Sequence, residues 1–137
     1  MNNNFDYGSE PFTINIKKAT CKNNAFRTAL WTGKYLQLTL MNLPLGEEIG
    51  LEMHNDTDQF LHIVSGRALI KMGSCKDKLN FQKCIGVDEA IFVPAGTWHN
   101  IINTGHRQLK IYSVYAPPNH PHSVVHKTKS DADKYEY

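Results

Sequence analysis

Short apolar runs separated by turn-forming residues recur along most of this chain of 137 residues. The runs are rich in Val, Ile, Leu and aromatic residues, and Gly, Pro, Asn and Asp gather between them. No segment shows a convincing helical repeat of about 3.6 residues. Many short strands at spacings of roughly 8–12 residues are typical of an all-β sandwich or barrel, so we expect this fold class. The expected strands are residues 26–31, 35–41, 59–64, 67–72, 79–85, 90–93, 99–103 and 109–115.

The two ends of the chain differ from its central region, residues 35–115, and we expect all three parts to belong to one domain. Residues 1–20 begin with polar side chains and then alternate from Phe12 to Ile16. This pattern predicts an edge strand or an arm that adds to a neighbouring subunit. The tail, residues 116–137, begins with prolines, and we expect a short helical turn in its last residues, 130–137.

Composition excludes several classes of protein. The net charge of +2 is too small to favour nucleic acid or an anionic membrane, and no apolar run reaches the length of a membrane span. Cys21, Cys75 and Cys84 show no C-x-x-C spacing, so we expect free thiols in a reducing compartment. The amino-terminal residues do not resemble a signal peptide, and we therefore expect a cytoplasmic protein.

Four polar side chains in two stretches predict a metal site. Glu52 and His54 are two residues apart and share one face of an extended segment. Gln59 follows a polar turn, and His99 begins a later strand after a second sharp turn. Two imidazoles and a carboxylate form the ligand set of non-haem Fe(II) sites, and Mn, Co, Ni and Zn accept the same donors.

Each of these residues also has a structural interpretation. His54 and His99 could be buried histidines satisfied by hydrogen bonds, and Glu52 could face solvent. Gln59 has the weakest case, because a neutral amide is a poor ligand and could instead hold a water or orient a neighbour. For His54, His99 and Glu52 we favour metal binding, and for Gln59 both interpretations stay open.

The same two stretches resemble the paired motifs of the cupin superfamily. The first motif has the spacing G, five residues, H-x-H, four residues, E, six residues, G, and the second ends in P-x-G, two residues, H, three residues, N. Asp88 occupies the place of a glycine in the second motif, and Gly86 lies two residues before it. The positions that match in spacing are Gly46, Glu52, His54, Gln59, Gly66, Pro94, Gly96, His99 and Asn103.

The resemblance implies a small jelly-roll β-barrel with one divalent transition metal inside one end. The family usually supplies three histidines and a glutamate. Here Glu52 replaces the first histidine and Gln59 replaces the glutamate, so the implied ligands are Glu52, His54, Gln59 and His99. The double replacement keeps one carboxylate, and we interpret it as relocation of the anionic ligand.

Cupins include isomerases, epimerases, lyases, decarboxylases, dioxygenases and non-catalytic binders, so the fold alone does not decide the function. Our first hypothesis is a metal-dependent enzyme acting on a small oxygen-rich substrate such as a sugar, a uronate or a keto acid. The alternatives are a non-haem Fe(II) dioxygenase and a module that binds or senses a small ligand without turnover. No general acid or base is identifiable. Small cupins often pair through an amino-terminal strand, so residues 10–16 lead us to expect a homodimer.

Two interpretations apply to the polar residues expected near the barrel mouth. Tyr35 and Gln37 lie on the polar face of their expected strand and could line the mouth or lie on the surface. The tail carries His120, His122 and His126 beside its prolines. One interpretation is a lid that brings a histidine to the site. We favour the other, a rigid tail packed on the outside or on a partner subunit.

Overall fold

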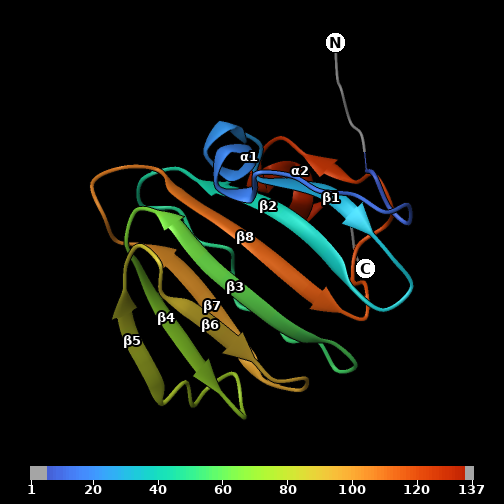
Figure 1. Cartoon of the computed structure of the whole chain (residues 1–137). Coiled ribbons are helices and arrows are strands. Elements are labelled where there is room, and N and C mark those ends of the chain that lie inside the picture. Colours follow the sequence, from blue (N-terminus) through green and yellow to red (C-terminus); the bar gives the residue numbers. More distant parts are fainter. Residues whose placement is uncertain (1–5, 135–137) are drawn as a thin grey trace.

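Two antiparallel sheets face each other in the computed structural model, which describes residues 6–134 (Figure 1). The larger sheet has the strand order β6-β3-β8-β2-β1-β9 and the smaller has the order β5-β4-β7. This arrangement confirms the all-β prediction. The strands are β1 (Arg27–Thr32), β2 (Gln37–Leu43), β3 (Asp58–Ser65), β4 (Ala68–Gly73), β5 (Phe81–Ile85), β6 (Ala90–Val93), β7 (Trp98–Asn103), β8 (Leu109–Ala116) and β9 (Val125–His126).

The amino-terminal segment is not the edge strand that its alternation predicted. The structure has α1 (Ile16–Lys22) after an irregular stretch, and Asn15 caps this helix by accepting a hydrogen bond from the Lys18 amide at 3.0 Å. Phe12, Ile14 and Ile16 instead line a groove on the outer face of the sheet, so packing of an irregular segment produced the alternation.

The same segment is bound to its own barrel. The Tyr7 amide donates to the Leu30 carbonyl at 2.9 Å, and the Trp31 indole donates to the Glu10 carbonyl at 2.8 Å. Within this chain residues 10–15 form no strand, and the homodimer stays a prediction. Helix α1 packs beside β2, β3 and β8, outside the barrel (Figure 1).

The barrel interior changes from apolar to polar along its strands. One cross-strand row joins Leu43 to Leu109, and the next joins Met41, Ile111 and Ile63, all fully buried. Burial of such a side chain contributes about 1.5–3 kcal/mol. The rows nearer the other end contain polar side chains: Thr39 with Ser113 and Leu61, then Gln37 with Tyr115, Gln59 and Val93. Polar groups are thus gathered inside one end of the barrel, where the expected metal site lies.

Asp88 explains how the second motif tolerates a displaced glycine. Asp88 has a φ of 68°, in the left-handed region that favours glycine but that aspartate tolerates better than most residues. Its amide donates to the Ile63 carbonyl at 2.9 Å, which fixes the turn before β6 against β3. The glycine position of the motif is therefore filled by a residue able to adopt its backbone conformation.

The tail contributes β9 and α2 (Lys129–Asp133), a helix that begins with a capping box formed by Thr128 and Asp131. The helical turn expected at residues 130–137 is confirmed in its first part, and residues 135–137 lie outside the described range. All three cysteines are free, as expected, and all three are exposed. No helix among residues 6–134 is long and apolar enough to cross a membrane.

Candidate metal centre

Glu52 and His99 are held opposite each other by the backbone. They form an isolated antiparallel bridge in which the Glu52 amide donates to the His99 carbonyl at 3.0 Å and the His99 amide donates to the Glu52 carbonyl at 2.9 Å. The carbonyl of His54 accepts from the Gly96 amide at 2.8 Å. Gly96 has a φ of 81°, so the turn before β7 requires the conformational freedom of glycine. These contacts bring the two motifs together.

The side chains of the three residues converge. Glu52 Oε1 lies 3.4 Å from the Nε2 atoms of both His54 and His99, and the three possible ligand atoms all lie within 4.8 Å of one another. Within residues 6–134 neither Nε2 makes a regular hydrogen bond, although both atoms are buried. Buried polar atoms normally have partners. Two buried imidazole nitrogens that lack partners and face the same carboxylate oxygen fit a divalent ion.

The protonation of His99 also suits a ligand. Its Nδ1 lies 3.0 Å from the Thr97 carbonyl, which can only accept, so Nδ1 carries the proton. The lone pair of Nε2 is then directed toward Glu52. A backbone carbonyl that fixes the other ring nitrogen is the usual way in which a protein orients a metal-bound histidine.

Gln59 is inside the barrel and is only 4% exposed. Its Nε2 donates to the Ser113 hydroxyl at 2.9 Å, while its Oε1 is buried without a hydrogen-bond partner among the described residues. The amide is therefore held by one end, and its oxygen remains available. This arrangement fits a fourth ligand and equally fits an acceptor for a water or a substrate hydroxyl.

The carboxylate of Glu52 is ionised at neutral pH. Burial alone would raise its pKa, but the His54 and His99 imidazoles beside the carboxylate outweigh burial and hold the pKa well below its usual value. The site thus supplies one full negative charge and two imidazole nitrogens, which is the chemistry expected for Fe, Mn, Co, Ni or Zn.

A cavity of about 310 Å³ opens beside these ligands. Its walls come from β1, from the segment that carries the first motif, from the tail and from α2. The tail therefore lies over the barrel mouth, and the preference for external packing was wrong for His120, which is 9% exposed. The lining residues are Phe26, Arg27, Ile49, Glu52, Met53, His54, Asn119, His120, Ala132 and Asp133.

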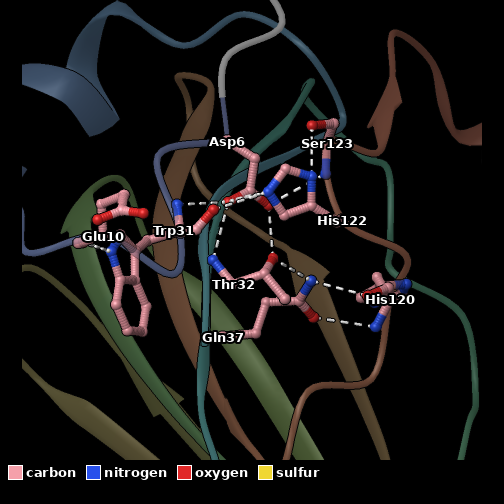
Figure 2. Close-up of polar contacts among 9 residues, drawn as sticks. Asp6, Glu10, Trp31, Thr32, Gln37, His120, His122 and Ser123 are labelled. Carbon is pink, nitrogen blue, oxygen red and sulfur yellow. Dashed lines mark hydrogen bonds and ion pairs between the residues drawn. The ribbon is translucent and has the colours of Figure 1, made fainter. Parts of the chain in front are cut away.

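Gln37 fixes the tail at this mouth (Figure 2). Its Oε1 accepts from the Asn119 and His120 amides at 3.1 and 2.9 Å. Its Nε2 donates to the His120 carbonyl at 2.8 Å and to the Thr32 hydroxyl at 3.0 Å. Of the two residues that could line the mouth, Gln37 is fully buried and anchors the tail there, whereas Tyr35 is exposed.

Asp6 extends this network to the amino-terminal segment (Figure 2). Its carboxylate accepts from the hydroxyl and the amide of Thr32, the latter at 2.8 Å, and from the Ser123 amide at 3.0 Å. His122 lies 3.4 Å from the same carboxylate but is half exposed. Asp6 therefore joins three segments around the mouth: the arm, the end of β1 and the tail.

Comparison with known proteins identifies the family. A family model described as Cupin domain matches residues 39–115, more than half of the chain. This chain belongs to the cupin family. It is similar to YrkC of Bacillus subtilis, described as uncharacterized, with 63% identity over 127 residues, which are 93% of this chain and 68% of that protein. It is also similar to the uncharacterized protein L612 of Acanthamoeba polyphaga mimivirus, with 36% identity over 114 residues, 82% of this chain and 69% of that one.

A solved structure shows the same fold. The crystal structure of BH2720 from Bacillus halodurans superimposes with a TM-score of 0.94 and 55% sequence identity, over 95% of this chain and 98% of that one. The cupin architecture predicted from the two motifs is therefore confirmed. The names of these relatives carry no activity, so the function of this cupin rests on its own residues.

Three residues of the cupin mouth gave no signal in the sequence. Arg27 and Asn119 line the cavity, and Tyr115 lies beside His54 with ring centroids 5.8 Å apart. Tyr115 falls on the inner face of its strand, and alternation predicts only that it is buried. Asn103, the last position of the second motif, donates to the carbonyls of Leu43, Pro44 and Arg107 and so closes the turn between β7 and β8.

Proposed function

We propose that this cupin is a metal-dependent enzyme that acts on a small oxygen-rich substrate, with an isomerase, epimerase or lyase type of reaction. The proposed ion is bound by Glu52, His54 and His99, with Gln59 as a possible fourth contact. The observation that carries the proposal is the convergence of Glu52, His54 and His99 beside an open cavity, where two buried imidazole nitrogens lack hydrogen-bond partners among the described residues. A carboxylate with two imidazoles leaves coordination positions for substrate oxygens.

A divalent ion bound here would supply Lewis acidity that polarises a carbonyl or hydroxyl of the substrate. The chain itself provides the other functions. Burial raises the pKa of Tyr115, so this phenol keeps its proton and can donate a hydrogen bond. Burial, followed by the charge of Arg27, lowers the pKa of His120 to about 3, so its ring is neutral. The Tyr115 and His120 rings pack edge to face, with their centroids 5.1 Å apart, in the wall of the site.

The ligand set also supports a second candidate, an Fe(II) dioxygenase. Two histidines and one carboxylate are the donors of non-haem Fe(II) oxygenases, and a neutral Gln59 would leave an exchangeable position. A binding module without turnover is the third candidate. These three functions predict different chemistry with the same ion.

The metal site is tested by the ion content of protein prepared without a histidine tag. We expect close to one transition ion per chain, and none in a Glu52→Ala, His54→Ala, His99→Ala variant. The matched control is His62→Ala with His106→Ala, which removes two imidazoles outside the site. If wild type stays empty after incubation with Mn, Fe, Co, Ni and Zn, the enzyme proposal fails.

Turnover is tested with the loaded protein. Oxygen-independent exchange of substrate protons with deuterated water supports the isomerase type. Oxygen uptake that requires Fe(II) supports the dioxygenase instead of the isomerase type. Thermal stabilisation by a substrate candidate, without any product, favours the binding module.

A further inference from the structure

Arg27 is a buried cation in the wall of the candidate site. It lies at the start of β1, lines the same cavity as Glu52 and His54, and is 5% exposed. Its backbone is fixed from both sides, because β1 pairs with β2 through Met41 and with β9 through His126. The guanidinium therefore occupies a defined place at the barrel mouth.

The partners of this guanidinium are neutral. Its Nη1 lies 3.3 Å from Nδ1 of His126, and its Cζ lies 5.2 Å from the ring centre of Phe26. Burial and the Arg27 charge lower the pKa of His126, so that ring carries no charge at neutral pH. Burial raises the pKa of Tyr115 by more than the charge and hydrogen bond of Arg27 lower it, so Tyr115 stays a protonated phenol. In the part of the chain that the structure describes, Nε of Arg27 makes no hydrogen bond.

The carboxylates that the structure describes along this wall and in α2 have other partners. Glu52 pairs with the two histidine ligands. In α2, Asp133 pairs with Lys129 at 3.4 Å, and Asp131 accepts from the Thr128 amide at 3.3 Å. None of the ion pairs among residues 6–134 includes Arg27. A buried charge is costly without a counter-ion, and residues 6–134 supply none to Arg27, so its presence needs an explanation.

We propose that Arg27 binds a carboxylate of the substrate, so that this cupin acts on small carboxylic acids that also offer oxygen donors to the metal. The contact between the substrate's other oxygen atoms and the metal rests on the proposed function, whereas binding of the carboxylate to Arg27 does not depend on it. A planar guanidinium matches a carboxylate with two parallel hydrogen bonds. A divalent ion and Arg27 together carry more positive charge than the single Glu52 carboxylate neutralises. A substrate anion would neutralise part of the remainder.

Two further features favour a carboxylate over a phosphate. The cavity has one buried guanidinium, whereas a phosphate dianion is usually bound by several donors or a helix N-terminus. Its volume of about 310 Å³ is at the lower end for ligand pockets and suits a molecule of a few carbon atoms.

The tail, held by Gln37 as Figure 2 shows, places Asn119 and His120 in the same wall before any ligand binds.

The test compares a carboxylic acid with its neutral amide. Binding of L-lactate, L-lactamide and inorganic phosphate is measured by calorimetry on zinc-loaded and on metal-free protein. We expect wild type to bind lactate at least about tenfold tighter than lactamide, and Arg27→Gln to lose this preference. Arg107→Gln, which removes an exposed guanidinium, should keep it. Equal binding of lactate and lactamide by wild type, a preference retained in Arg27→Gln, or tighter Arg27-dependent binding of phosphate would each overturn the proposal.

Two controls separate this inference from the metal proposal and from simple unfolding. Metal content should be the same in Arg27→Gln and wild type. If neither protein binds metal, the metal proposal fails, but the preference of metal-free protein for lactate over lactamide still tests Arg27. Arg27→Met keeps the apolar stem and removes the buried charge. It should melt at or above the temperature of ligand-free wild type, whereas a large drop would show that Arg27 has a structural partner instead.

Discussion

Glu52 and His99 face each other across a backbone bridge of two hydrogen bonds, and their side chains meet with Oε1 3.4 Å from Nε2. The two residues come from different motifs of the chain, so the bridge that pairs the motifs also assembles the site. A small shift of either segment would separate the donor atoms. Metal binding and the docking of the two motifs should therefore be coupled.

The first prediction concerns the charge of Glu52. Glu52→Gln keeps the size and shape of the side chain and removes the only carboxylate among the three converging ligands. We expect at least about a hundredfold weaker metal binding, because loss of outer-shell partners alone costs 10–100-fold. Competition with a chelator of known affinity measures this change. Glu10→Gln, on the exposed arm, should bind metal like wild type, and an unchanged affinity of Glu52→Gln would remove the carboxylate from the ligand set.

The second prediction tests whether the anionic ligand has been relocated. Gln59→Glu with Glu52→His restores the usual ligand pattern of the family and keeps one carboxylate. We expect this double variant to bind metal close to wild type, while Glu52→His alone, which has no carboxylate at either position, binds much more weakly. The comparison is a double-mutant cycle on metal affinity. Simple additivity of the two changes would show that the positions act independently.

The third prediction concerns the tail. Gln37→Ala removes an acceptor for two tail amides and a donor to the His120 carbonyl. We expect a loss of about 2–3 kcal/mol in the free energy of unfolding, because several buried groups lose their partner. Hydrogen exchange of the Asn119 and His120 amides should accelerate more than that of β3. Gln82→Ala, on the exposed strand β5, should change neither quantity.

Much of the fold could be predicted from local sequence. The observed bounds of β6 are the predicted ones, and most other strands differ by one or two residues, because alternation reports directly which side chains face the core. Helix α1 was missed because it has only seven residues, too few to show a helical repeat, and because the alternation before it suggested a strand. Asn15 was the available signal, since it is a good N-cap residue.

The candidate site was predictable only in part. Glu52 and His54 are close in sequence, and the motif spacing connects them to His99. The wall of the cavity depends instead on pairing between distant segments. Arg27 meets His126 across 99 positions of the chain, and Gln37 meets His120 across 83. No local periodicity carries such information, so the role of Arg27 could be found only from the structure.

The last prediction follows from the neutral histidines in the cavity wall. Burial and then the Arg27 charge lower the pKa of His120 from 6.5 to about 3, and burial lowers that of His126. Between these values the unfolded chain binds a proton that the folded chain does not. The contribution of neutral His120 to the free energy of unfolding is therefore complete above pH 6.5 and falls as the pH decreases toward 3, by up to about 1.4 kcal/mol per pH unit. His126 changes the stability in the same direction. Denaturant unfolding of metal-free protein between about pH 4.5 and 7.5 measures the slope. His120→Gln should flatten it, whereas His106→Gln, at an exposed site, should leave it unchanged, and a profile of wild type that is already flat in this range would contradict the neutral burial of His120.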